Sequence, residues 1–259
     1  MAAKTRLDCH ERSLLGKRVM VTRPASSPDP LAEQLRELGA EVIVQPAVRI
    51  GPPADWQPVD DALARLDQFD WLVFSSANGV RSLLGRLLEN GNLQRIRSVK
   101  LAAIGPGTAK ELGRYDLKAD LVPEQFRAEA LAEALACGAT GRRFLLARAS
   151  RGREVLAEQL AAAGAVVEQI VVYGSTDVKE PNPKVAATLS AGRIDWVTVT
   201  SSAIARSLVR LFGEKLRRTK LASISPLTSG VLRELGYEPA VEATEYTMSG
   251  LVAAIARAS

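Results

Sequence analysis

The chain contains an internal repeat, and this repeat limits the folds that the chain can adopt more than any other feature of its sequence. GKRVMVTRPASSPDPLAEQLRELGAEV (Gly16–Val42) aligns without gaps on GRRFLLARASRGREVLAEQLAAAGAVV (Gly141–Val167), at an offset of 125 residues. At the same offset, DWLVFSSANGVRSL from Asp70 aligns on DWVTVTSSAIARSL from Asp195. A duplication explains these matches better than chance does, and a repeat of this length determines the architecture.

A third pair of segments, Val99–Leu112 and Thr219–Leu232, aligns at an offset of 120 residues. Each repeated part begins with a short apolar run, continues through a Ser-, Gly- or Pro-containing turn, and ends in apolar residues at helical spacing. The predicted strands are Val19–Val21, Leu72–Phe74, Leu101–Ile104, Phe144–Leu146, Val197–Val199 and Leu221–Ile224. Alternating strands and helices predict an α/β fold with parallel sheets that are covered on both faces.

Two segments are candidates for connections between domains. Val42–Ile50 and Val166–Ser175 are both followed by Pro-rich or polar stretches, which commonly separate domains. Two crossings would make one domain discontinuous, whereas a division into one repeat per domain stays open on periodicity alone.

The composition excludes several classes of protein. The 259 residues include 34 basic and 29 acidic residues, a net charge of +5 that favours a small anionic ligand but does not indicate a nucleic-acid partner. The single histidine, His10, and the two cysteines, Cys9 and Cys137, provide no metal site, disulfide framework or His-dependent triad. Without an apolar run of about 18 residues or a signal peptide in Met1–Ser13, we expect a cytoplasmic protein that has a disordered N-terminal tail and no membrane segment.

Four turns follow predicted strands at the positions where helices should begin: Ser75–Gly79, Gly105–Thr108, Thr200–Ala203 and Ser225–Thr228. A helix start offers free N–H groups and a partial positive charge, which suit a carboxylate or a phosphate. Each turn alone is also explained as ordinary helix capping. Their occurrence as two repeated pairs favours a function, and the absence of GxGxxG and GxxxxGK[ST] patterns disfavours a nucleotide cofactor.

Two further kinds of residue are candidates for the site. Arg23 and Arg148 follow equivalent strands, with Arg151 and Arg153 close by, and arginine binds carboxylates through two N–H groups. A solvated charged turn explains Arg151 equally well, but it explains the repeated Arg23 and Arg148 less well. Tyr173 ends a connecting segment and is either a site residue or a core tyrosine.

Taken together, these motifs resemble the uroporphyrinogen-III synthase family over nearly the whole chain beyond about residue 14. The similarity is carried by VTRP (Val21–Pro24), GAEV (Gly39–Val42), LVFSSANGV (Leu72–Val80), AAIGPGTAKEL (Ala102–Leu112), LLARASRGRE (Leu145–Glu154), VVY (Val171–Tyr173), VTSS (Val199–Ser202), ASISPLTSGVLRELGYEP (Ala222–Pro239) and EYTMSGLVAAI (Glu245–Ile255). Ser225, Ala149 and Ile204 depart from the family pattern, the first two standing where glycine is usual.

The resemblance implies two flavodoxin-like α/β domains with parallel sheets, related by duplication and joined by two strands. It favours a discontinuous domain of residues 1–45 and 176–259 and an inserted domain of residues 46–175. The implied substrate is hydroxymethylbilane, a linear tetrapyrrole with eight carboxylates, which a monomeric enzyme, a lyase of heme biosynthesis, cyclises to uroporphyrinogen III without cofactor or metal.

The implied mechanism starts with loss of the terminal hydroxyl to give an azafulvene, continues through a spiro intermediate and inverts ring D. By family analogy, Tyr173 assists departure of the hydroxyl. The implied substrate-binding residues are Arg23, Ser75, Ser76, Ala77, Asn78, Gly105, Gly107, Thr108, Arg148, Arg153, Ser201, Ser202, Leu227 and Thr228. A cytosolic binder or sensor of a small polyanion is the main alternative, because a tetrapyrrole methyltransferase needs a glycine-rich loop that the chain lacks.

Overall fold

The computed structural model describes residues 13–24 and 29–259, so the expectations for Cys9, His10 and the N-terminal tail lie outside the described residues. The chain forms two compact units. Unit 1 contains the chain up to Arg49 together with Thr176–Ser259, and unit 2 contains Ile50–Ser175. The expected domain limits at 45/46 and 175/176 remain our proposal for the folding domains.

Unit 1 contains one parallel sheet with the strand order β10-β9-β8-β1-β2. By rank along the chain this is the order 2-1-3-4-5 of flavodoxin-like sheets. The strands are β1 (Arg18–Val21), β2 (Glu41–Val44), β8 (Trp196–Val199), β9 (Lys220–Ser223) and β10 (Val241–Glu242). The helices are α1 (Pro30–Glu37), α7 (Pro183–Ser190), α8 (Ser202–Phe212), the 3-10 segment η3 (Gly213–Arg218), α9 (Pro226–Glu234) and α10 (Met248–Arg257).

Unit 2 contains the second sheet, with the strand order β3-β7-β6-β4-β5. Its strands are β3 (Val48–Gly51), β4 (Trp71–Phe74), β5 (Lys100–Ala103), β6 (Arg143–Ala149) and β7 (Val166–Asp177), of which β3 and β7 carry the chain between the units. Its helices are α2 (Gln57–Ala64), η1 (Leu66–Gln68), α3 (Ala77–Glu89), η2 (Leu93–Ser98), α4 (Pro106–Gly113), α5 (Ala128–Ala136) and α6 (Val155–Ala162). The predicted α/β class with parallel sheets and a two-strand connection is confirmed.

The strand pairings of the two units agree residue by residue at the offsets of the sequence repeat. Val19 pairs with Trp196 in unit 1, and its repeat partner Phe144 pairs with Trp71 in unit 2. The pair Arg18–Glu41 in unit 1 has the counterpart Arg143–Val166 in unit 2. The isolated bridge from Ala102 to Leu121 takes the place that the β9–β10 pairing, Ala222 to Val241, has in unit 1. Duplication is therefore visible in the register of the sheets as well as in the sequence.

Neither unit is a single copy of the repeat. Unit 1 combines β1 and α1 of the first copy with β8 and β9 of the second copy, and unit 2 combines β6 and α6 of the second copy with β4 and β5 of the first copy. The simpler division into one repeat per domain is therefore wrong for the compact units.

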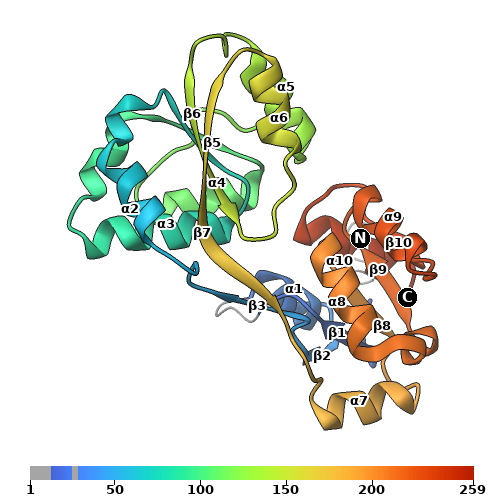
Figure 1. The fold of residues 1–259 in the computed structure, drawn as a ribbon. Coiled ribbons are helices and arrows are strands. Elements are labelled where there is room, and N and C mark those ends of the chain that lie inside the picture. The colour runs from blue at the N-terminus through green and yellow to red at the C-terminus, as the bar shows by residue number, and fades with distance from the viewer. Residues whose placement is uncertain (1–12, 25–28) are drawn as a thin grey trace, which may run out of the picture. The chain divides into compact units, whose positions relative to one another are not determined.

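Both sheets are buried on their two faces by alternate residues of each strand. In unit 2, Leu72 and Phe74 pack toward α2, α3 and α4, whereas Val73 packs toward α5 and α6. Figure 1 shows α3 on one side of this sheet, and α5 and α6 on the other. In unit 1, Met20 packs toward α7, α8 and α9, and Val19 packs toward α1 and α10. This alternation explains why the strands read as continuous apolar runs.

The Asp-Trp pair that opens each repeated stretch belongs to the amino edges of the sheets. Asp70 Oδ2 accepts the N–H of Arg143 at 2.9 Å, and Asp195 Oδ2 accepts the N–H of the equivalent Arg18 at 2.8 Å. The Lys100 ammonium lies 5.5 Å from the ring centre of Trp71, and that of Lys220 lies 5.0 Å from Trp196. The repeated Asp and Trp therefore hold neighbouring strands together, at the edge opposite the Ser-containing turns.

Candidate functional site

The carboxyl edge of each sheet presents the start of two helices. In unit 2, α3 and α4 begin directly after β4 and β5, and in unit 1, α8 and α9 begin after β8 and β9. Within the described chain, these starts leave backbone N–H groups without an acceptor at Ala77, Asn78, Gly107, Ser202, Ala203 and Leu227. Unpaired N–H groups together with the helix dipole attract anionic groups.

The serine hydroxyls at these helix starts are already engaged as caps. Ser76 Oγ accepts the N–H of Gly79 at 3.0 Å, and Ser201 Oγ accepts the N–H of Ile204 at 3.2 Å. Ser225 Oγ lies 3.4 Å from the Thr228 nitrogen and 3.2 Å from Thr228 Oγ1. The serine hydroxyls therefore serve as helix caps. The backbone N–H groups between each capping serine and the N–H that it accepts stay free and are available to an anion.

The turn before α4 differs chemically from the equivalent turn before α9. Gly105 begins α4 without a side-chain cap, and a Cβ added there would lie 3.1 Å from Phe126 Cβ. A Cβ added at Gly107 would have no atom within 4 Å. Leu227, the repeat partner of Gly107, is an exposed apolar side chain. Thr108 and Thr228 are both buried. At two positions of this turn, unit 2 thus has the glycines Gly105 and Gly107, where unit 1 has a serine and a leucine.

Tyr173 lies on β7 with its hydroxyl at the start of α3. The Tyr173 Oη to Ser76 Oγ distance is 3.0 Å, and the side chain is 7% exposed. Burial raises the pKa of Tyr173 above its ordinary value of 10.0, and the hydrogen bond with Ser76 opposes this shift. The phenol is therefore protonated at neutral pH and is able to donate a proton.

Arg148 and Arg23 occupy equivalent positions of the repeat, and each forms an ion pair with an acidic side chain. The Arg148 guanidinium forms an ion pair with Glu154 and donates to Gln169 Oε1 and the Gly152 carbonyl, each at 2.7 Å. Arg23 Nη1 lies 3.2 Å from Asp29 Oδ1. Hydrogen bonds from Gln169 and Arg148 lower the pKa of Glu154.

Asp29 and Glu154 are repeat partners, so the duplicated unit contains an Arg-acid pair six residues apart. Each acid stands at the start of a helix, α1 or α6. The aligned repeat contains the signal for this pair, whereas the sequence pattern favoured a carboxylate ligand for the arginines, with a solvated turn as the alternative.

The two remaining arginines of the loop after β6 also have partners. Arg153 Nη1 donates to Glu129 Oε1 at 2.7 Å and lowers the pKa of that carboxyl. Arg151 Nη2 donates to Ser175 Oγ at 3.1 Å. These contacts join the loop to α5 and β7, which leaves the backbone starts of the helices as the main polar groups of the edge.

The structure brings one group of the candidate residues to the carboxyl edge of unit 2 and another to the carboxyl edge of unit 1. The first group is Ser75, Ser76, Ala77, Asn78, Gly105, Gly107, Thr108, Arg148, Arg153 and Tyr173. The second is Arg23, Ser201, Ser202, Leu227 and Thr228. Among the described candidate residues, Ser76 and Tyr173 are the one pair whose side chains are hydrogen-bonded to each other from separate elements.

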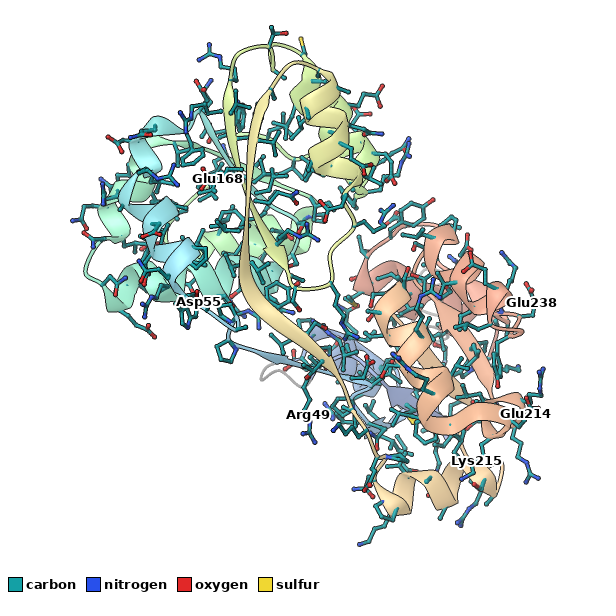
Figure 2. All side chains as sticks on the ribbon, in the orientation of Figure 1. Arg49, Asp55, Glu168, Glu214, Lys215 and Glu238 are labelled. Carbon is teal, nitrogen blue, oxygen red and sulfur yellow. The ribbon has the colours of Figure 1, made fainter. Side chains whose placement is uncertain are left out.

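Several charged side chains lie elsewhere on the molecule. Figure 2 shows Glu168 on β7, where its carboxylate pairs with Arg65, and Glu214 and Lys215 in η3, which leads into the amino end of β9. Among the described residues, no group of His, Cys, Asp and Glu side chains could hold a metal ion, and Cys137 is a free, exposed thiol. Over the same residues, no helix is long and apolar enough to cross a membrane.

Fold and site together define a class: a duplicated, parallel α/β protein whose helix starts present free N–H groups at the carboxyl edges of its sheets. A family model described as uroporphyrinogen-III synthase HemD matches residues 29–253. The chain is 35% identical to a uroporphyrinogen-III synthase of Synechococcus elongatus over 95% of this chain and 96% of that protein. It is also 26% identical to the enzyme of Escherichia coli, over 85% and 92% of the two chains. The chain therefore belongs to the uroporphyrinogen-III synthase family, enzymes of tetrapyrrole biosynthesis.

Solved structures agree on the fold. A uroporphyrinogen-III synthetase from Helicobacter pylori matches with a TM-score of 0.64 at 18% identity, covering 94% of this chain and 99% of that one. A mutant uroporphyrinogen III synthase from Thermus thermophilus matches with a TM-score of 0.63 at 19% identity, covering 93% and 98%. The family model and the curated relatives confirm the predicted family, its function and its enzyme class.

Proposed function

We propose that this protein cyclises hydroxymethylbilane to uroporphyrinogen III with inversion of ring D, and that the substrate carboxylates bind the carboxyl edges described above. The observation that carries this proposal is the combination of unpaired helix-start N–H groups with one protonated phenol, Tyr173, at the same edge. Backbone donors bind carboxylates without placing acids or bases beside a reactive tetrapyrrole.

Tyr173 serves as the proton donor for the leaving hydroxyl in this proposal. The C–O bond breaks with its electron pair going to oxygen, the phenol proton passes to that oxygen, and water leaves. The positive charge that develops on the tetrapyrrole is delocalised over the pyrrole nitrogen. Ring closure releases a ring proton, which restores the phenol, so the complete reaction loses one water and changes no redox state. The protein directs the ring closure by holding the chain ends, which is control by orientation.

The substrate-binding role of each residue is also a proposal. The contacts of the candidates divide them by the group that each contributes. Ala77, Asn78, Gly107, Ser202 and Leu227 contribute free N–H groups. Ser75 contributes an exposed hydroxyl, and Thr108, Thr228, Gly105 and Ser201 shape the turns. Arg23, Arg148 and Arg153 hold the flanking loops through Asp29, Glu154 and Glu129 and contribute positive charge to the edge.

The deciding experiment supplies freshly made hydroxymethylbilane to the protein and separates the uroporphyrin isomers after oxidation. We expect isomer III as the main product at a rate above spontaneous closure. Isomer I alone, formed at the spontaneous rate, would reject the proposal, and tight substrate binding without turnover would favour a polyanion binder instead. Turnover should persist in the presence of a metal chelator and without added cofactor.

We further propose that the protein acts as a cytoplasmic monomer with no nucleic-acid or membrane partner. Light scattering coupled to gel filtration should give a mass near 27.8 kDa. A mass of twice this value that persists on dilution would contradict the monomer.

A further inference from the structure

A β-bulge sets the direction of the Tyr173 side chain. In the pairing of β6 with β7, Arg148 lies opposite Val171 and the next residue, Ala149, lies opposite Tyr173, so Val172 is an extra residue on β7. In a regular strand that alternates at every residue, Tyr173 would lie on the same face as Val171, which is exposed. With the bulge, Val172 and Tyr173 are both buried in the cluster that packs against α3. Bulges commonly redirect a side chain in this way beside active sites.

Main-chain contacts fix this arrangement from both sides of the bulge. The Tyr173 carbonyl accepts the N–H of Ser150 at 3.0 Å, and Ser150 Oγ accepts the N–H of Ser175 at 3.0 Å. A Cβ added at Gly174 would lie 2.9 Å from the Pro52 carbonyl oxygen, so β7 approaches the segment after β3 too closely for any other residue there. The backbone at Tyr173 therefore has little conformational freedom. The position of the Tyr173 hydroxyl then depends on the side chain that it contacts.

The ring tip meets Ser76. Ser76 Oγ lies 3.0 Å from Tyr173 Oη and also accepts the N–H of Gly79 at 3.0 Å. One lone pair of the serine oxygen is therefore used by the helix cap, which leaves the serine O–H free to donate to the phenol oxygen. In that arrangement the phenol proton points away from Ser76 and stays available to another group.

We propose that Ser76 is a positioning residue, whose hydroxyl donates to Tyr173 Oη, orients the phenol proton toward the leaving hydroxyl and stabilises the phenolate formed when that proton is transferred. This inference rests on the proposed function of Tyr173 and assigns Ser76 a role through Tyr173 rather than through a substrate carboxylate. No oxidant or cofactor enters the step, because the proton lost by Tyr173 leaves as part of water and is regained from the tetrapyrrole.

Unit 1 shows that a serine can cap a helix at this position without a hydrogen bond to a tyrosine. Ser201 caps α8 as Ser76 caps α3, but the repeat partner of Tyr173 is Val48, a buried aliphatic residue. The serine in unit 1 thus retains the capping bond and lacks a phenol. The Ser76–Tyr173 bond is a feature added to the duplicated scaffold.

The test uses Ser76→Ala and Ser76→Thr in the full chain, with Asn182→Ala as a control. Asn182 Oδ1 accepts the N–H of Lys184 at 2.9 Å at the start of α7, so this control removes a helix cap whose side chain is not hydrogen-bonded to a tyrosine. Two readouts are taken: steady-state isomer III formation, and the tyrosinate absorbance of each variant over alkaline pH, with a Tyr173→Phe background subtracted to isolate Tyr173.

We expect Ser76→Ala to lower kcat about tenfold with KM changed less than about twofold, because the lost bond acts on the transition state. The tyrosinate titration of Tyr173 should move to higher pH, and so should the alkaline limb of kcat. Ser76→Thr should restore both, and Asn182→Ala should match the unaltered protein in both.

An unchanged tyrosinate titration in Ser76→Ala would overturn the inference, as would an unchanged kcat. An equal loss of kcat in Asn182→Ala would do the same, because it would assign the effect to helix capping in general. Failure of the proposed function is recognised separately: the unaltered protein would then give only isomer I, whereas the titration would still report on the Ser76–Tyr173 bond.

Discussion

The two units share one scaffold and differ at one edge. The backbone pairings coincide at the offsets of the repeat, and so do the Asp-Trp-Lys contacts at the amino edges of both sheets. At the carboxyl edges, Tyr173 stands where unit 1 has Val48, and Gly107 stands where unit 1 has Leu227. After duplication, the amino edge kept its role in joining strands, while the carboxyl edges became chemically distinct. Under the proposed function, a substrate with many carboxylates but one leaving hydroxyl would use two binding edges and one proton donor.

Replacing the phenol should produce the largest change, and it tests whether the proton donor belongs to unit 2 alone. Tyr173→Phe is expected to lower kcat by about a hundredfold, the lower range for the loss of a general acid. Tyr237→Phe is the matched control in unit 1, because Tyr237 is also 7% exposed and lies outside the candidate site. Turnover and the fraction of isomer III are measured together. Equal activity in both variants would mean that the difference between the edges is not catalytic.

A second comparison concerns two glycines within helices of unit 1. A Cβ at Gly250 would lie 2.2 Å from the Glu245 carbonyl oxygen, whereas a Cβ at Gly230 meets no atom within 4 Å. Gly250→Ala should therefore destabilise the protein by about 2–3 kcal/mol through overpacking. Gly230→Ala should stabilise it by about 0.5–1 kcal/mol, because alanine loses less backbone entropy in a helix. Urea unfolding measures both effects.

Unit 2 tolerates Ala130 at the position equivalent to Gly250, at the same point in α5. The close approach at Gly250 is therefore specific to unit 1. An unchanged urea midpoint in Gly250→Ala would show that the turn before α10 relaxes as readily as the turn before α5.

The fold was predictable to the extent that local pattern determines it. The apolar runs predicted all six strands of the repeat, because strands buried on both faces need continuous apolar sequence. To predict that the units exchange parts of the repeat, the connecting segments had to be considered as well. Pro-rich stretches after Ile50 and Ser175 indicated a discontinuous domain, but periodicity could not exclude one repeat per unit.

The candidate site was less predictable because its key relations are three-dimensional. Ser and Gly turns at the ends of strands pointed to the helix starts, and these helices do begin there. The bulge at Val172 leaves no mark in a single sequence, since valine fits a regular strand equally well. The partners of Arg148 also depend on how the loop folds, so the sequence favoured a carboxylate ligand where the structure has Glu154.

The amino edges offer a third comparison, in which the two units should differ by a smaller amount. Asp70 accepts the N–H of Arg143 and pairs with Arg142 at 2.5 Å, whereas the Asp195 carboxylate, which accepts the N–H of Arg18, lies 4.0 Å from Lys17 Nζ. We expect Asp70→Ala to cost about 1–2 kcal/mol of unfolding free energy and Asp195→Ala about 1 kcal/mol. A larger loss in Asp195→Ala would contradict the contacts.

The contribution of Asp70 should also depend on pH. The hydrogen bonds from Arg143 and Arg142 lower the pKa of Asp70 below its ordinary value of 3.8. A lowered folded-state pKa means that the stabilisation is fully present above 3.8 and is lost as the pH falls through the folded-state value. The difference in unfolding free energy between the unaltered protein and Asp70→Ala should therefore shrink below this pH. A difference that stays constant down to strongly acid pH would contradict the pairing.

The smallest expected effect comes from exchanging Gly107 and Leu227, the repeat partners that differ most in size. Leu227 is 47% exposed, so the pyrrole rings have apolar surface to cover there, and Leu227→Gly should raise KM about fivefold with kcat unchanged. A Cβ added at Gly107 meets no atom within 4 Å, and a leucine there would shield a free N–H, so Gly107→Leu should raise KM about threefold. If the edges bind different parts of the substrate, the double variant should show both losses multiplied. Recovery of KM in the double variant would mean that the two edges are interchangeable and that their chemical difference has no part in substrate orientation.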